Sequence, residues 1–203
     1  MRHTLAVAAI ALIVSGGPPA RAAITEQERQ RLLSHLDMTA AWLADEVAGL
    51  TPAQTAFRGA PEAWSIAENV EHLVLVSEIY WQNLQDALKT RLKPGATAKS
   101  RMTDADVLWY GIDRTWREQA IPTERSPGKL RDVGAGMETY RKNHARLRQF
   151  IATTAQDLRA HIVQRQGCDA YQWALLISTH EQRHILQIRE IKASRGFPGK
   201  VSP

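Results

Sequence analysis

Apolar residues recur every three or four positions along most of the chain after residue 24, which is the spacing of an amphipathic α-helix. The first such stretch predicts a helix over residues 25–48. Thr25 followed by Glu28 matches a capping box, in which each side chain accepts a hydrogen bond from the other residue's backbone amide, so we expect the helix to begin there. Its apolar positions are Leu32, Leu36, Ala40, Leu43 and Val47.

A second helix is predicted to begin at Ser65. Ser65 and Glu68 repeat the capping-box pattern, and Trp64 occupies the preceding position of a hydrophobic staple. Lys93-Pro94-Gly95 is expected to end this helix, because proline cannot continue it. One stripe of the helix contains Val70, Leu73, Val74, Ser77, Trp81, Leu84 and Leu88.

The second half of the chain predicts two more long helices, one over about residues 136–160 and one from Asp169 to about Ser194. Residues 95–134 carry no long apolar period, and only a short helix over about residues 103–119, which includes Trp109 and Trp116, is indicated there. No stretch has the two-residue alternation of a half-buried strand. The pattern therefore predicts an all-α protein, a four-helix bundle with an irregular crossover between its second and third helices.

Residues 1–22 have the features of a signal peptide. Arg2 precedes the ten-residue apolar run LAVAAIALIV, helix-breaking glycines and prolines follow, and Ala20-Arg21-Ala22 matches an A-x-A cleavage site. The run is shorter than the about 20 apolar residues that a transmembrane helix needs. We therefore expect a secreted or periplasmic protein, cleaved near Ala22, with one domain over residues 23–203 and no stable membrane anchor. A buried N-terminal helix is the alternative.

Charge and cysteine content narrow the function classes. The 203 residues include 26 Lys+Arg and 21 Asp+Glu, and loss of residues 1–22 would remove two of the arginines. Because basic and acidic residues are interleaved without a Lys/Arg run, we expect no binding to nucleic acid. The single cysteine, Cys168, excludes an intramolecular disulfide and a cysteine-based metal site, and we expect it in a partly covered loop.

The last predicted helix carries His180 and His184 on its apolar stripe. Residues four apart lie on one face of a helix, about 5–6 Å from one another, which suits two ligands of one metal ion. Two inward imidazoles also need partners for their nitrogen atoms, and a shared metal supplies one. A hydrogen-bonded polar pair in the core is the alternative. The same stripe contains Trp173, Ile177, Gln187 and Ile191.

His72, on the second predicted helix, is the candidate for a third ligand, since bundle metal sites combine side chains from facing helices. Three imidazoles leave at least one position open, which is typical of catalytic and not of structural sites. Such a set suits zinc, nickel or ferrous iron, and affinity alone does not choose among them. The predicted metal ligands are thus His72, His180 and His184, and no catalytic residue is identified.

The remaining histidines and one acid are interpreted as structural. His144 lies on an apolar stripe and is expected at the boundary of the core, with a fourth metal ligand as the alternative. His35 and His161 are expected at the surface. Glu68 precedes His72 by four residues, so it either only caps the helix or orients that histidine.

Residues 180–184, HEQRH, also match the H-E-x-x-H motif of zinc peptidases, in which Glu181 would be the general base. Those enzymes need a third ligand, usually further along the chain. Only 19 residues follow His184, and none of them is a histidine. We therefore keep the zinc peptidase as the less favoured hypothesis.

Two segments together resemble the DinB-like family. AWSIAENVEHL at residues 63–73 is similar to the W-S-x-x-E-x-x-x-H-L start of that family's second helix. AYQW at 170–173, followed by HEQRHILQI at 180–188, resembles its final helix with the H-x-x-x-H pair. The resemblance covers about residues 25–195 and is loose over residues 93–134.

This resemblance implies a four-helix bundle with a non-simple helix order, and a divalent metal held by three histidines, here His72, His180 and His184. The family includes bacillithiol S-transferases and mycothiol-dependent isomerases, and dimers are common in it. We therefore expect a metal-dependent enzyme acting on a small molecule, either a thiol S-transferase or a hydrolase. The thiol cofactors are cytoplasmic, so the expected export makes hydrolysis as good an expectation as sulfur transfer.

Arg183 and Arg141 are candidates to receive a substrate carboxylate, with a plain surface position as the alternative for each. A non-catalytic helical binding module, whose histidines are structural, is the alternative from a different class of protein.

Overall fold

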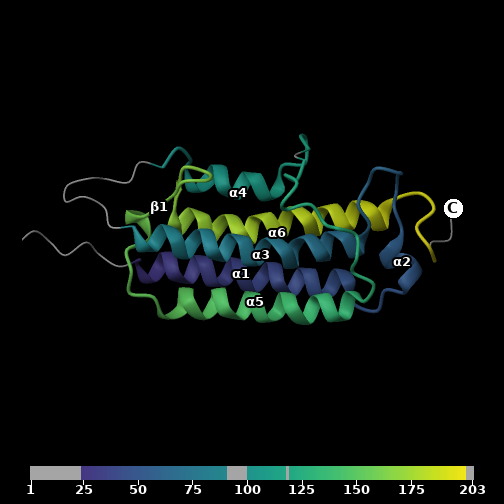
Figure 1. Cartoon of the computed structure of the whole chain (residues 1–203), viewed down its shortest axis with the longest axis horizontal. Coiled ribbons are helices and arrows are strands. Elements are labelled where there is room, and N and C mark those ends of the chain that lie inside the picture. The colour runs from purple at the N-terminus through teal and green to yellow at the C-terminus, as the bar shows by residue number, and fades with distance from the viewer. Residues whose placement is uncertain (1–23, 91–99, 118, 200–203) are drawn as a thin grey trace, which may run out of the picture.

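The computed structural model describes residues 24–90, 100–117 and 119–199. Four long helices lie side by side in it and form a four-helix bundle, as the sequence predicts (Figure 1). The predicted signal peptide and the first part of the crossover, residues 91–99, lie outside the described residues. The bundle helices are α1 (Glu26–Val47), α3 (Ile66–Lys89), α5 (Val133–Thr153) and α6 (Ala170–Ala193).

Short elements connect the bundle helices. In the crossover between α3 and α5, α4 ends at Ile112 and not near residue 119, because the chain turns into loop after Asp113. The sequence analysis did not predict α2 or the small antiparallel hairpin, in which Ile162 pairs with Asp169 and Val163 with Cys168. These elements are α2 (Pro52–Ala56), α4 (Asp104–Ile112), the 3-10 turn η1 (Leu158–Ala160), β1 (Ile162–Val163) and β2 (Cys168–Asp169).

Side-chain caps set the starts of the helices. The predicted capping boxes at Thr25, Ser65 and Asp169 are all present. α5 begins three residues earlier than predicted, because the Asp132 carboxylate accepts hydrogen bonds from the backbone amides of Gly134 and Ala135 at 2.8 and 3.3 Å. The same helix ends at Thr153 and not near residue 160, since η1 and the hairpin occupy the following residues.

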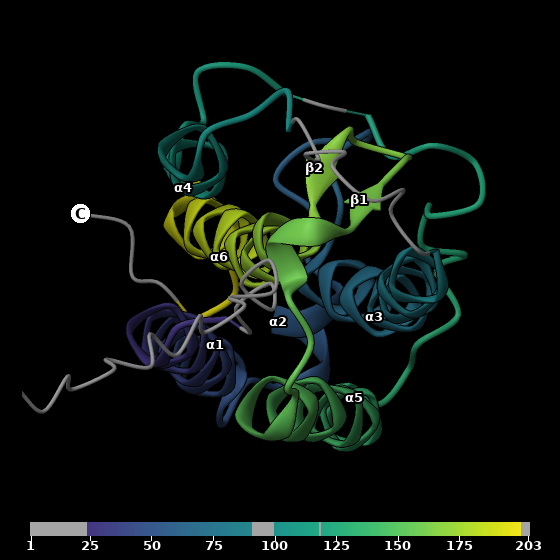
Figure 2. The same ribbon diagram turned by 90° about the vertical axis from the view of Figure 1, so that its left-hand side faces the viewer.

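The helices do not follow one another around the bundle in chain order. α1 packs against α5 and α6, and α3 packs against the same two helices, so α1 and α3 lie across a diagonal (Figure 2). The chain must therefore cross the bundle twice, once between α1 and α3 and once between α5 and α6. This is the non-simple helix order that the family resemblance implied.

α6 is the central element of the fold. α1 and α3 cover two of its sides, and α4 lies on its outer side as an extra layer (Figure 1). The approach of α4 is close, because a Cβ atom at Gly111 would come within 2.8 Å of the Thr179 carbonyl oxygen. As a result, 17 of the 24 residues of α6 are buried.

The buried apolar residues form two clusters, one toward each end of the bundle. The first contains Leu36, Val76 and Trp173, and the second contains Val70, Met137 and Ile185. On α6, His180 and His184 lie between the two clusters, and on α3 His72 lies beside Leu73 at the inner edge of the second cluster. A polar layer thus crosses the middle of an otherwise apolar core.

Arg159 joins four elements at one end of the bundle. Its guanidinium pairs with Asp104 at 2.7 Å, with Glu28 at 3.0 Å and with Asp169 at 3.1 Å, and it lies 3.7 Å from the centre of the Tyr171 ring. Hydrogen bonding to Arg159 lowers the pKa of Asp104 below its ordinary 3.8. The arginine thereby anchors the start of α4 to α1 and α6.

We expect Arg159→Met to lower the free energy of unfolding by about 1–3 kcal/mol near neutral pH, because it removes charge-assisted hydrogen bonds and leaves the buried Asp169 carboxylate without its cationic partner. A carboxylate whose pKa is lower in the folded than in the unfolded protein stabilises the fold at pH values above its unfolded pKa. This stabilisation is lost as the pH falls through the folded pKa. The difference in the free energy of unfolding between the variant and the unmodified chain should therefore become smaller below pH 3.8, which is the ordinary pKa of an aspartate. Urea unfolding near neutral pH and at about pH 3 measures both.

Arg148→Met is the matched control, since Arg148 pairs with Asp37 at the exposed surface. Exposed pairs contribute little, so this variant should lose less than about 1 kcal/mol. Equal losses in the two variants would show that Arg159 has no special role in joining the helices.

Candidate metal centre

Three histidines meet in the polar layer between α3 and α6. His72 comes from α3, and His180 and His184 come from successive turns of α6. All three are buried, with exposed fractions of 2%, 6% and 8%. The structure therefore brings together the three residues that the sequence predicts as ligands.

The three imidazoles point the same nitrogen atom at a common centre. The Nε2 atom of His180 lies 3.3 Å from that of His72 and 3.2 Å from that of His184. Within the described part of the chain, one ligand atom from each residue falls in a group no more than 4.8 Å across.

Hydrogen bonds on the far side of two rings fix which nitrogen carries the proton. The Nδ1 atom of His72 lies 2.6 Å from the carbonyl oxygen of Glu124, which can only accept, so Nδ1–H donates. The Nδ1 atom of His184 lies 2.8 Å from Oδ1 of Asn69, whose amide nitrogen in turn donates to the Ser65 carbonyl oxygen at 2.8 Å. Both rings thus present a bare Nε2 lone pair to the centre.

Burial keeps all three rings neutral. It lowers the pKa of His72 to about 4, although the hydrogen bond to Glu124 acts in the opposite direction. Burial, the neighbouring histidines and the nearby Arg183 hold the pKa values of His180 and His184 well below the ordinary range. The site is therefore ready to coordinate a cation without first releasing protons.

The donor set and its spacing fit a divalent metal ion. Two nitrogen atoms that each lie about 2.0–2.1 Å from one ion are about 3.0–3.4 Å apart at ordinary coordination angles. The Nε2 separations of His180 from His184 and from His72, 3.2 and 3.3 Å, fall in that range. The Nε2 lone pairs of His72 and His184 converge on one centre and repel one another, and a cation there would remove that repulsion.

Aromatic rings enclose the three histidines. Trp64, just before α3, stacks on His184 with a ring separation of 6.0 Å and lies 4.9 Å from His72. Tyr110 of α4 stacks on His180 at 6.4 Å, and Tyr80 of α3 lies 5.4 Å from it. These rings exclude bulk water from the surroundings of the Nε2 atoms.

Glu71 holds the crossover against α3, beside His72. Its carboxylate accepts backbone hydrogen bonds from Gly128, Lys129 and Leu130 at 2.7, 3.0 and 2.9 Å, and one from the Ser126 hydroxyl. The Glu124 carboxylate pairs with Arg165 at 2.6 Å. Both contacts position the segment whose carbonyl oxygen at Glu124 orients His72.

Arg183 fastens α4 and the following loop over α6. Its buried guanidinium donates to the carbonyl oxygens of Tyr110 at 3.1 Å and Trp116 at 2.6 Å, and also to that of Asp113. It also lies over the Tyr110 and Trp116 rings. Its donors are engaged, so the structure does not support Arg183 as a free receptor for a substrate carboxylate.

Glu181 does not reach the three histidines. Its position is rotated on α6 toward α1 and α5, where its carboxylate accepts a hydrogen bond from the Thr39 hydroxyl at 2.8 Å and faces the buried Tyr140. Burial raises its pKa to about 7. The general-base role that the peptidase motif requires is therefore wrong for this chain.

The other three histidines in the described part of the chain lie apart from the centre. His144 is partly buried with Nε2 3.1 Å from the Leu36 carbonyl oxygen, which confirms the boundary position and not a fourth ligand. His161 is half-exposed beside Thr90. The expectation that His35 lies at the surface is wrong, because α1 packs on α6 there and brings its Nδ1 within 2.8 Å of the Ser178 hydroxyl.

Three further expectations are resolved by burial and contacts. Cys168 is fully buried in β2 and not in a partly covered loop, and burial raises the pKa of its thiol to about 12. Glu68 caps α3 and pairs with Arg58, and His72 donates its hydrogen bond to the Glu124 carbonyl oxygen of the crossover instead. Arg141 is exposed on α5, which supplies no ligand.

Sequence reasoning missed the residues that support the ligands. Asn69 had a signal, since a polar side chain one turn before His72 lies on the same inward face. Glu124 had none, because it contributes a backbone carbonyl group from an irregular segment. Glu71 and Arg183 resemble ordinary surface charges when only the sequence is considered.

The sequence profile that describes the DinB superfamily matches residues 24–188. No curated protein matches the chain significantly. Among solved structures, the chain is similar to one described as "YfiT from Bacillus subtilis is a probable metal-dependent hydrolase with an unusual four-helix bundle topology". That match has a TM-score of 0.53 and 15% sequence identity, and it covers 88% of this chain and 94% of the other. At this identity the similarity establishes the fold.

Proposed function

The chain belongs to the DinB superfamily, and from this premise we propose that it is a hydrolase of small molecules that depends on a divalent metal held by His72, His180 and His184. The observation that carries the proposal is the convergence of three buried, neutral Nε2 atoms from two facing helices. The description of the structurally similar YfiT as a metal-dependent hydrolase supports the reaction class.

The residues around the centre would have three different roles. The three histidines hold the ion, while Asn69 and the Glu124 carbonyl group fix the rings through their Nδ1 atoms. Trp64 and Tyr110 keep bulk water away from the ligand nitrogens. A divalent ion bound there would supply Lewis-acid activation of a water molecule or of a polarised substrate bond.

The donor set limits which ion is suitable without naming one. Three imidazole nitrogens suit zinc, nickel or ferrous iron better than magnesium or calcium, which prefer oxygen ligands. Three protein ligands also leave a coordination position open, as catalytic sites require.

Removal and return of the metal tests this function. Protein without a histidine tag is stripped with a chelator and then reloaded with zinc, nickel or ferrous iron. We expect about one ion per chain by elemental analysis, and hydrolysis of a panel of small esters and amides that disappears with the metal and returns with it. The rate should depend on which ion is restored.

Each alternative predicts a different result. If the protein conjugated an added low-molecular-weight thiol to an electrophile and hydrolysed nothing, the activity assigned to this site would be thiol transfer and not hydrolysis. Binding of about one ion with neither reaction would favour a non-catalytic binding module. No binding of any of the three ions would overturn the metal site itself.

A further inference from the structure

The turn of the β1–β2 hairpin contacts the crossover through an ion pair. Arg165 lies in this turn, and its guanidinium pairs with the Glu124 carboxylate at 2.6 Å. The side chain of Glu124 is 6% exposed and that of Arg165 is 29% exposed. Because removal of one partner of such a buried pair leaves a charge without compensation, the pair fixes the place of residue 124. The backbone also joins the two segments, since the Arg101 amide donates to the Gly167 carbonyl oxygen at 2.9 Å.

The hairpin that carries Arg165 is anchored in the core. Val163 and Cys168 pair across its two strands and both belong to a buried apolar cluster. The amides of Gln166 and Gly167 donate to the Val163 carbonyl oxygen at 3.3 and 3.0 Å, and Gly167 has a φ of +65°, a left-handed conformation that favours glycine. β2 leads directly into α6, which carries two of the three ligands. Arg165 therefore starts from a fixed point close to the ligand-bearing helix.

Glu124 connects this ion pair to the third ligand. Its backbone carbonyl oxygen accepts a hydrogen bond from Nδ1 of His72 at 2.6 Å, which directs Nε2 of that ring at the centre. Glu71 holds the crossover from residue 126 onward, whereas Arg165 acts on residue 124 itself. The carboxylate of Glu124 is thus held by the hairpin while its carbonyl oxygen holds His72.

The same guanidinium lies near a ligand of the other helix. Its carbon atom is 5.6 Å from the centre of the Tyr80 ring, and that ring lies 5.4 Å from the ring of His180. Arg165 is thus linked to one ligand on each helix, through Glu124 and through Tyr80. The link through Glu124 consists of an ion pair and a hydrogen bond, so it constrains the orientation of a ligand ring.

We propose that Arg165 is a positioning residue of the metal centre, which holds His72 in its ligand orientation through Glu124 and thereby strengthens metal binding. This inference rests on the proposed metal site and adds to it a residue from the hairpin. Partners that bond a ligand ring directly change metal affinity by about 10–100-fold, and Arg165 acts one residue further away, so we expect an effect of about three- to tenfold.

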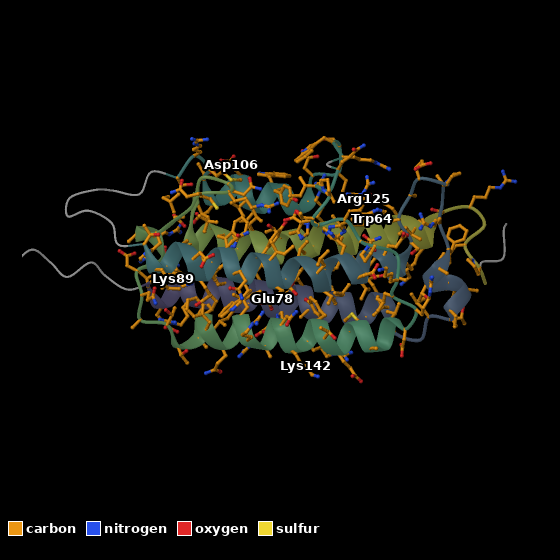
Figure 3. The ribbon with its side chains drawn as sticks, in the orientation of Figure 1. Trp64, Glu78, Lys89, Asp106, Arg125 and Lys142 are labelled. Carbon is orange, nitrogen blue, oxygen red and sulfur yellow. The ribbon has the colours of Figure 1, made fainter. Side chains whose placement is uncertain are left out.

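Matched variants isolate this role. Arg165→Met removes the guanidinium, Glu124→Gln removes the charge but keeps the backbone carbonyl group, and a third variant combines the two. Arg146→Met is the control, because Arg146 pairs with Glu78 at 2.5 Å and also lies over an aromatic ring. Figure 3 shows Glu78 on the side of α3 that faces α5, and Arg125, the neighbour of Glu124, on the side of the crossover. Thermal unfolding confirms that each variant folds.

Competition with a chelator measures the zinc affinity of each untagged chain. Arg165→Met should weaken zinc binding about three- to tenfold, and Arg146→Met less than about twofold. The double variant should bind no more weakly than the weaker of the two single variants, since the two residues act as one pair. Unchanged affinity in Arg165→Met, or additive losses in the double variant, would overturn the proposal.

A second readout needs no metal. NMR of the histidine rings follows the exchange of each Nδ1 proton with water, which should become at least about twofold faster for His72 in Arg165→Met. The Nδ1 proton of His184 should be unaffected, because its acceptor is Asn69. If the unmodified chain bound no zinc, the metal centre itself would be wrong, and the exchange rates would still show whether Arg165 holds the ring. Equal rates for His72 in the two chains would overturn the positioning role.

Discussion

We expect His180→Ala to bind no divalent metal at neutral pH, under conditions in which the unmodified chain is expected to bind about one ion. His180 is the histidine whose Nε2 atom lies 3.3 Å from His72 and 3.2 Å from His184, so it joins the other two ligands. Its removal leaves one imidazole on each helix and no pair on one helix face. Elemental analysis of untagged protein after dialysis against each metal measures the loss.

Two further variants make this result specific. His161→Ala removes a histidine outside the cluster and should leave the metal content unchanged. Asn69→Leu keeps all three ligands but removes the acceptor that fixes His184, so we expect a 10–100-fold weaker affinity (roughly) and not complete loss. If His180→Ala retained its metal, the three-histidine centre would be wrong. If Asn69→Leu bound as tightly as the unmodified chain, the hydrogen bond to His184 would have no role in binding.

The largest effect on stability is expected from Trp173→Ala. Trp173 is fully buried in α6, its ring lies 5.0 Å from that of Tyr80, and its indole N–H donates to the Tyr80 carbonyl oxygen at 2.9 Å. Truncation would leave a cavity in the apolar cluster beside the histidines, and such changes cost about 3–5 kcal/mol. The free energy of unfolding in urea, measured without added metal, gives the value.

Trp109→Ala is the matched control, because the same substitution there removes a side chain that is mostly exposed. It should change the free energy of unfolding by less than about 0.5 kcal/mol. Similar losses at the two positions would mean that the interior around Trp173 rearranges to fill the space, or that α4 stabilises the bundle more than its position suggests.

The parts of the fold that follow from local chemistry could be predicted from the sequence. Thr25, Ser65 and Asp169 each start a helix through a side chain that bonds to the backbone three residues away, and that pattern is local. Thr51 and Gln54 form the same pattern before α2, yet the helix was missed because it is only five residues long and has no apolar period.

The start of α5 shows how composition can mislead. Gly134 and Gly136 interrupt the helical pattern, so the prediction placed the start of the helix at residue 136. The glycine at 136 is accommodated because α5 lies close to its neighbours there, where a Cβ atom would be 2.8 Å from a Leu130 methyl group. The Asp132 cap sets the start locally, whereas the approach of Val70 from α3, 3.1 Å from that Cβ position, leaves no local signal.

The residues of the candidate centre also fall into two groups, those with a local sequence signal and those without one. The ligands His180 and His184 could be predicted because helical spacing places them on one face, and His72 because it follows a recognisable helix start. Glu124, which fixes His72, could not be predicted because it acts through its backbone. Arg183, which fastens α4 over α6, could not because it acts through three carbonyl groups of another segment. The peptidase hypothesis is wrong for a geometric reason, because the Glu181 carboxylate is turned away from the histidines and bonds to Thr39 of α1.

The central place of α6 has a consequence for the synthesis of the protein. α6 follows the other three bundle helices in the chain, so the ribosome makes it after them. Until residues 170–193 have emerged, α1 and α3 have only α5 to pack against, and two of the three histidines have not yet been made. The nascent chain therefore remains open, and a target for chaperones and proteases, until its final bundle helix is complete.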